Sequence, residues 1–234
     1  MQIPVTHVQS NLANTTVNWL PSDTKERWLK NCKDTANWQY FEHMGWNNED
    51  SITYTFNQYG FRSPPLLPSV KNFIALGCSF TVGTGLPVKT VWPSLIEQAT
   101  GITAYNLGVY GMSLDACYRL ARYYIPQLNP RFVIVLPPPP TRMEILENKI
   151  YQTIMFDSTK YKSFVQNWFA YKENMYLHQE KTLGALENLC FKNNCRLYVL
   201  PEFDKILDHA RDLMHQGPKT HKHTIENFLR TADL

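Results

Sequence analysis

The sequence predicts an α/β fold built on a parallel sheet, preceded by an N-terminal extension that is rich in aromatic residues. From residue 72 onward, short apolar runs typical of strands buried on both faces alternate with stretches of helical spacing. Strands separated by helices are joined by right-handed crossovers into a parallel sheet. Residues 1–70 differ, because four of the six tryptophans lie there: Trp19, Trp28, Trp38 and Trp46. We therefore expect a main domain over 71–234 and an extension over 1–70 that packs on it.

The extension is predicted to contain one short helix and one strand. Asp23, with Glu26 three residues later, resembles a helix-capping box and would open a helix that ends near Cys32. Residues 51–56 alternate as in a strand and end at a turn over 57–60. We expect the tryptophans to anchor the extension on the main domain, since each aromatic side chain buries a large area. The alternative is that they form a sugar-stacking wall near a functional site.

The main domain is predicted as strands and helices in alternation. The strands are the apolar runs at 73–76, 104–107, 132–136 and 196–200. The helices are expected at about 90–99 and 113–127, as one long helix at about 164–193, and as short helices at 204–213 and 220–231.

Bulk composition excludes several classes of function. The formal net charge of +3 is small, and no block of Lys and Arg is long enough to follow a nucleic-acid backbone. No apolar stretch approaches the roughly 18 residues of a membrane helix. The first residues lack the cationic start and apolar run of a secretory signal. A soluble cytoplasmic protein is the expectation, without nucleic-acid or membrane partners.

The cysteines and histidines form neither a disulfide framework nor a metal site. Five scattered cysteines without a Cys-x-x-Cys pair favour reduced thiols. Four histidines lie near the C-terminus, but their spacing matches no recognised zinc pattern. We therefore expect no metal.

Ser79 is the first candidate for chemistry. It follows the predicted strand 73–76 at a strand-to-helix turn, and ligands collect at the carboxyl ends of parallel strands. Gly77 permits the tight turn, and the Ser79 N–H can point toward a developing oxyanion. A serine that only caps the next helix is the alternative. Thr81 stands where the α/β-hydrolase elbow requires glycine, and no Gly-Lys-Ser/Thr ending completes a nucleotide-binding loop.

Asp212 and His215 are the second candidate. They lie three residues apart, so both side chains can share one face of a helical turn or compact loop. A carboxylate beside an imidazole holds the ring in one tautomer and stabilises the imidazolium formed during proton transfer. A surface ion pair of little energetic value is the alternative.

Taken together, these segments resemble the motifs of the SGNH/GDSL hydrolases. The segments 77–81 (GCSFT), 106–111 (NLGVYG) and 212–215 (DLMH) occur in the order and separation of that family. The lead-in 57–62 (NQYGFR) is similar to an element found ahead of the nucleophile in some members. The resemblance spans about 55–230, most of the chain.

The resemblance implies a three-layer α/β/α, flavodoxin-like fold that hydrolyses esters without a cofactor. Ser79 would attack the acyl carbon, His215 would act as general base and acid, and Asp212 would orient His215. The oxyanion hole would use the backbone N–H of Ser79 and that of Gly111. Asn106, at the start of the second motif, is a candidate for contact with the substrate.

Two departures from the family pattern concern the nucleophile turn and the oxyanion hole. Cys78 stands where the family usually has aspartate, so the support of the turn must differ. Cys78 itself as nucleophile is disfavoured, because thiolate activation needs an adjacent base. Pro140 falls where the family's oxyanion asparagine is expected, and proline has no N–H. Thr141 and Arg142 are the candidates for the third donor.

Two other roles are open for Arg142: it could bind an anionic group of the substrate, or it could pair with Glu144. The expected activity is that of an esterase or deacetylase on O-acyl groups, with a small-molecule or carbohydrate ester, such as an acetylated carbohydrate, as substrate. The alternative is a degenerate binding module with the same fold and little turnover, which Pro140 would favour.

Overall fold

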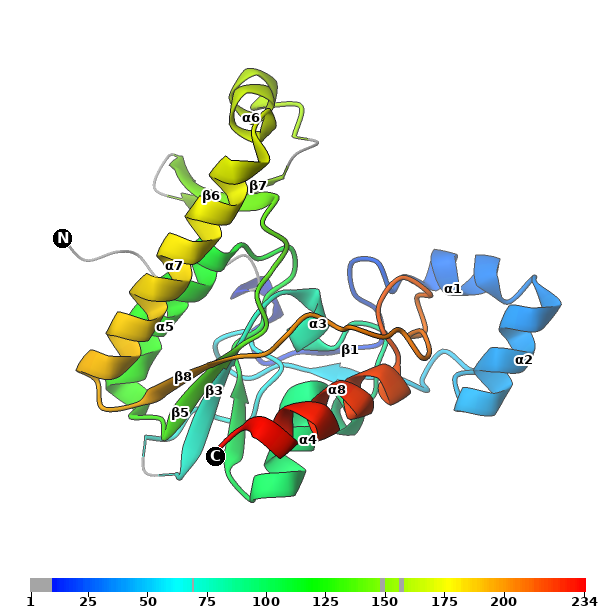
Figure 1. Ribbon diagram of the computed structural model, residues 1–234. Helices are drawn as coiled ribbons and strands as arrows, with labels where there is room; N and C mark the ends of the chain where they lie inside the picture. Colours follow the sequence, from blue (N-terminus) through cyan, green and yellow to red (C-terminus); the bar gives the residue numbers. More distant parts are fainter. Residues whose placement is uncertain (1–9, 69, 148–149, 156–157) are drawn as a thin grey trace.

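The computed structural model describes residues 10–68, 70–147, 150–155 and 158–234, and its centre is a four-stranded parallel sheet (Figure 1). The strands run in the order β4-β3-β5-β8, with bounds β3 Asn72–Leu76, β4 Thr103–Asn106, β5 Phe132–Val135 and β8 Arg196–Val199. The predicted α/β class with a parallel sheet is confirmed. Each strand lies within one residue of the predicted run at its start and end.

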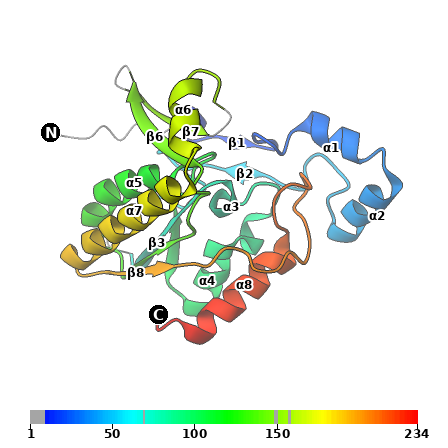
Figure 2. The ribbon, with the colours of Figure 1, turned by 45° about the horizontal axis from the view of Figure 1, so that its top comes forward.

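Helices cover both faces of the sheet and make a three-layer arrangement (Figures 1 and 2). One face carries α5 (Leu114–Leu128) and α7 (Lys172–Lys192), and the other carries α4 (Trp92–Thr100) and α8 (Pro218–Thr231). Alternate side chains of the buried strands therefore pack into two separate apolar clusters, as the period of two requires.

The extension shares the core on the α4 and α8 side. Its elements are η1 (Ser10–Leu12), β1 (Thr16–Val17), α1 (Lys25–Asn31), α2 (Thr35–Met44) and β2 (Tyr54–Thr55). β1 pairs with β2 in an antiparallel two-stranded ribbon. Three of the four tryptophans belong to this core or pack against it: Trp19, Trp28 and Trp46. The domain boundary near residue 70 stays a prediction.

The start of α1 corrects the predicted capping box. The N-cap is Thr24, whose side chain accepts a hydrogen bond from the Arg27 N–H at 3.2 Å. Asp23 is instead buried at 1% exposure and paired with a distant arginine. The helix α2, which the sequence did not predict, is capped in the same way by Asp34.

Two predicted helices are also corrected. The long helix over 164–193 is divided into α6 (Lys162–Phe169) and α7, because Tyr171 is extended and the Asn174 side chain donates to the Trp168 carbonyl. The helix over 204–213 is a loop. Asp208 binds the N–H groups at the start of α8, and Asp212 binds those of the turn that leads to His215. An unpredicted hairpin, β6 (Arg142–Glu147) with β7 (Ile150–Met155), follows β5.

The strand order places the nucleophile turn at the switch point of the sheet. From β3 the chain continues to β4 on one side and then to β5 on the other side. In open α/β sheets, ligands bind in the crevice at the carboxyl ends of the strands where the order reverses. Ser79 begins α3 (Ser79–Val82) directly after β3, at this point. The remaining short element, η2 (Val88–Thr90), leads into α4.

Candidate active site

The turn after β3 requires glycine at position 77. Gly77 has φ +149°, and a Cβ there would lie 2.2 Å from the Thr81 Oγ1 and 2.8 Å from the Leu136 carbonyl oxygen. Thr81 can approach so closely only because no side chain intervenes. The chain therefore turns sharply and presents Ser79 at the first position of α3.

Ser79, His215 and Asp212 form one chain of hydrogen bonds. The Ser79 Oγ lies 2.8 Å from the His215 Nε2, and the His215 Nδ1 lies 2.6 Å from the Asp212 Oδ2. The structure therefore brings together the three residues that the sequence singled out, although Ser79 and His215 are 136 positions apart in the chain. With its Nδ1–H donated to the carboxylate, the imidazole faces the hydroxyl with an accepting Nε2.

The carboxylate of Asp212 is held in its ionised form. Its Oδ1 accepts from the backbone N–H groups of Met214 and His215, each at 3.0 Å. Burial raises the pKa of Asp212, but the hydrogen bonds from His215 and the backbone outweigh it and keep the pKa below its usual value. Leu213, at φ +57°, lets the backbone fold back over the carboxylate. The pair is therefore formed in a compact loop, where the Asp212 carboxylate binds both the imidazole and the backbone N–H groups of the turn.

The loop that carries Asp212 and His215 is closed on itself at its base. The Ala210 N–H donates to the His215 carbonyl at 2.9 Å. Asp208 accepts from the Lys219 and Thr220 N–H groups, each at 2.9 Å, and so caps the start of α8. These bonds hold the acid and the base against the end of a long helix.

A fully buried ion pair joins this loop to the extension. Arg211 is 0% exposed and donates to both carboxylate oxygens of Asp23, at 3.1 and 2.7 Å. Its guanidinium also lies 4.2 Å from the centre of the Trp19 ring. The Tyr54 hydroxyl donates to Asp23 at 2.5 Å and accepts from the Gly85 N–H at 2.8 Å. One network therefore connects the acid and base loop with the loop behind α3.

Sequence reasoning missed this network for a physical reason. Asp23 carries a local signal for a helix cap, and Arg211 lies 188 residues away with no periodic pattern around it. In the sequence, only the concentration of aromatic residues indicated that the extension has a structural role. Pairing between such distant residues is a property of the folded chain.

The segment 106–111 lies directly beside the nucleophile turn. The Val109 N–H donates to the Gly77 carbonyl at 3.1 Å. Gly111 has φ +60°. Neither the Ser79 N–H nor the Gly111 N–H donates a hydrogen bond to any residue in the described part of the chain. Their binding of an oxyanion stays a prediction.

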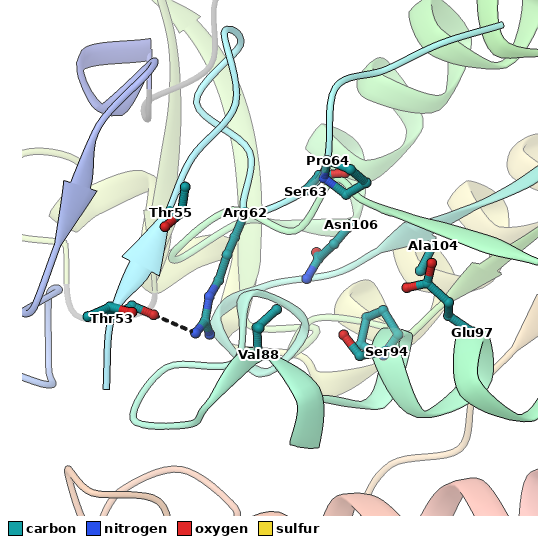
Figure 3. Close-up of a pocket in the computed structure, with 11 residues that line it drawn as sticks. Thr53, Thr55, Arg62, Ser63, Pro64, Val88, Ser94, Glu97, Ala104 and Asn106 are labelled. Carbon is teal, nitrogen blue, oxygen red and sulfur yellow. Dashed lines mark hydrogen bonds between the residues drawn. The ribbon is translucent and has the colours of Figure 1, made fainter. Parts of the chain in front are cut away.

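Asn106 braces this arrangement from behind. Its amide donates to the Thr81 carbonyl at 2.6 Å, and its Oδ1 accepts from the Gly108 N–H at 3.0 Å. It also lines a cavity of about 320 Å³ that includes Arg62 and Glu97 and none of the three hydrogen-bonded residues above (Figure 3). Contact between Asn106 and substrate stays a prediction.

Arg62, in the lead-in that the sequence marked, supports the end of α3. It is 3% exposed and donates to four backbone carbonyls, those of Thr53, Val82, Gly83 and Leu86. Figure 3 shows the bond to Thr53. Burial lowers the pKa of Arg62 from its usual value. A buried guanidinium thus holds the backbone carbonyls at the end of α3 in place.

The candidates for a third oxyanion donor lie at the base of the β6–β7 hairpin. Thr141 precedes β6, and Arg142 is its first residue, with its N–H donating to the Pro139 carbonyl at 3.1 Å. The alternative pairing of Arg142 with Glu144 is wrong. Glu144 binds Arg119 through two hydrogen bonds of 2.7 and 2.8 Å, because that arginine lies opposite it on α5. The donor role stays a prediction.

Cys78 is buried in an apolar environment. It is 1% exposed and packs in the apolar cluster on the α5 side. The described residues contain no group of three or more His, Cys, Asp or Glu that could hold a metal ion. Among the same residues, no helix is long and apolar enough to cross a membrane.

The chain is similar in structure to known proteins but has no match by sequence. No family model matches the chain, and no curated protein matches it. A solved structure described as TesA is similar at 11% identity and a TM-score of 0.40, over 70% of this chain and 98% of that one. A member of the lipolytic protein G-D-S-L family from Veillonella parvula DSM 2008 is similar at 10% identity and a TM-score of 0.38, over 69% and 98%. The likeness is one of fold.

Proposed function

We propose that the protein is a serine-dependent ester hydrolase that acts on O-acyl groups, with a small-molecule or carbohydrate ester such as an O-acetylated carbohydrate as its substrate. The observation that carries this proposal is the continuous chain of hydrogen bonds from the Ser79 Oγ through His215 to Asp212. A nucleophile, a base and an orienting carboxylate in contact are the recurrent arrangement for acyl transfer.

In the proposed mechanism, the Ser79 Oγ attacks the acyl carbon while its proton passes to the His215 Nε2. Asp212 stabilises the imidazolium that results, and its low pKa keeps it ionised in the pH range of the reaction. The N–H groups of Ser79 and Gly111 bind the oxyanion. The imidazolium then protonates the leaving alcohol, and water, deprotonated by His215, releases the acyl group from Ser79.

The third oxyanion donor has two candidates at the start of β6. Thr141 and Arg142 remain its candidates, and a site with two donors would be slower by on the order of a hundredfold or more. If both Thr141→Ala and Arg142→Ala leave kcat unchanged, neither is the donor.

The test of the proposed function is hydrolysis of p-nitrophenyl acetate by the wild type, Ser79→Ala and the matched control Ser163→Ala, an exposed serine on α6. We expect kcat of Ser79→Ala to fall by on the order of a thousandfold or more, with Ser163→Ala unchanged. A fluorophosphonate should add its mass to Ser79 alone. Equal rates in wild type and Ser79→Ala, or an adduct on another residue, would refute the assignment.

A binding module with the same fold is the second candidate, and Pro140 at the expected asparagine position favours it. It predicts that ester analogues bind but that Ser79 reacts no faster than an ordinary serine. Labelling of Ser79 by the fluorophosphonate at a rate that depends on His215 would exclude this candidate.

A further inference from the structure

A second cavity lies beside the hydrogen-bonded residues, over the ends of β5 and β8. It has a volume of about 210 Å³, several times that of a water molecule. Its lining residues come from the start of α3, the segments after β5 and β8, and the residue after His215; they are Phe80, Leu136, Pro137, Pro139, Glu202, Phe203 and Gln216. The cavity therefore lies at the carboxyl edge of the sheet, where ligands of such folds bind.

The lining is continuous with the proposed general acid. The Phe80 ring lies 5.0 Å from the His215 ring and 5.9 Å from the Phe203 ring, centre to centre. Gln216 follows His215 directly in the chain. Because the imidazolium donates its proton to the leaving oxygen, the alcohol part of an ester must lie next to His215.

The position of the oxyanion donors supports the same orientation. Gly111 follows β4, whereas the cavity lies over β5 and β8. The strand β3, which leads to Ser79, separates β4 from β5. An ester whose carbonyl oxygen faces Gly111 can therefore direct its leaving group toward this cavity.

The chemistry of the lining favours a flat, uncharged group. Phe80, Phe203, Leu136 and the two prolines have no side-chain polar atom, and proline has no N–H donor either. The two aromatic rings meet at 71°, which gives the cavity rigid, flat walls. Glu202 is exposed and is the one charged residue among those that line the cavity, so it disfavours anions.

We propose that this cavity binds the alcohol part of the ester as an uncharged ring. The inference rests on the proposed function and names the substrate class of the same site: esters of ring alcohols, among them acylated sugars, in preference to esters of short open-chain or anionic alcohols. The apolar face of the ring lies on Phe203. The hydroxyls of a sugar can bind Glu202 and Gln216.

The first experiment removes the flat wall. We expect Phe203→Leu and Phe203→Ala to lower kcat/KM about threefold to tenfold for phenyl acetate and for an acetylated methyl glucoside, and to leave ethyl acetate unchanged. Because all three substrates form the same acetyl-enzyme, its hydrolysis rate in burst experiments should stay constant. The matched control is Phe191→Ala, 80% exposed at the end of α7 and at the opposite edge of the sheet.

Three outcomes separate the possibilities. Equal losses for phenyl and ethyl acetate would overturn the inference. A changed ratio of phenyl butyrate to phenyl acetate, which share an alcohol, would also overturn it and assign the cavity to the acyl group. If Ser79→Ala were as active as wild type, the proposed function would fail instead. Saturation-transfer NMR with methyl glucoside on wild type and Phe203→Ala would then test whether the cavity binds a ring without turnover. Equal signals from the two proteins would refute ring binding in this cavity.

The second experiment changes the charge. We expect Glu202→Gln to raise kcat/KM for 4-acetoxybenzoate about threefold at low ionic strength, with phenyl acetate unchanged and with the gain lost at high salt. An equal change for the anionic and the neutral ester would contradict the role given to Glu202.

Discussion

Replacing Asp23 by asparagine tests whether the extension positions the acid and base loop. The substitution keeps the size of the side chain but leaves the Arg211 guanidinium, 0% exposed, without its counter-charge. Breaking a buried pair by removing one partner costs about 3–5 kcal/mol, because the other charge stays buried and uncompensated. Asparagine can still accept one of the two hydrogen bonds, so we expect a loss near 3 kcal/mol. That is a large part of the stability of a typical domain.

The assay is urea unfolding followed by tryptophan fluorescence, with p-nitrophenyl acetate hydrolysis measured on the folded variant. A matched control is Glu49→Gln, which breaks the exposed pair with Lys25 and should cost less than about 1 kcal/mol. We expect kcat of Asp23→Asn to fall about tenfold or more, since small displacements of catalytic groups are costly. KM should change little, because Asp23 lies outside the cavity beside Phe80.

A double variant distinguishes the cost of the uncompensated Arg211 charge from the cost of the lost hydrogen bonds. Replacing both partners, as in Asp23→Asn with Arg211→Met, removes the uncompensated charge and should recover about 1–2 kcal/mol relative to Asp23→Asn alone. A single Asp23→Asn variant with wild-type stability and kcat would refute the reasoning. So would a double variant less stable than either single one.

Three further predictions concern buried groups near the site. Burial, together with the neighbouring His215, lowers the pKa of His221 from 6.5 to about 3, so only the unfolded chain takes up a proton there between those values. The free energy of unfolding should therefore fall by about 1 kcal/mol per pH unit below pH 6.5, and less steeply in His221→Gln; equal slopes in urea titrations would contradict this. Gly77→Ala should lose at least about 2 kcal/mol in the same assay, because its Cβ would clash with Thr81, and a neutral effect would exclude that contact. Arg62→Met leaves four carbonyls without a donor, so the free energy of unfolding should fall by about 2–4 kcal/mol. Fluorophosphonate labelling of Ser79 should also slow. An unchanged labelling rate would show that α3 does not need the support of Arg62.

The elements predicted correctly are those whose sequence pattern depends only on residues within the element itself. The apolar run 73–76 became β3, and the helical spacing over 113–127 became α5. In both, burial of a continuous face requires the same periodicity that the sequence displays. Ser79 was also found from a local signal, the turn that follows a strand, and Asp212 and His215 were found from their spacing of three residues.

The elements predicted wrongly are those where a local signal competes with a distant partner. Asp23 has the spacing of a capping box, but its carboxylate binds Arg211 and leaves the cap to Thr24. Residues 204–213 were expected to be helical. Asp208 there caps α8, and Asp212 binds the backbone of the turn before His215. A side chain with two possible partners takes the one that the completed core places beside it.

The sequence by itself determined the α/β class, the order of the strands along the chain, and the identity of Ser79, Asp212 and His215 as candidates, because periodicity and turn chemistry depend on neighbouring residues. Tertiary structure alone decided that these three residues meet at 2.8 and 2.6 Å and that the extension holds their loop through Arg211. It also decided that a cavity lined by Phe80 and Phe203 lies beside His215. These features depend on which segments distant in the chain pack together, and that is settled only when the whole core is buried.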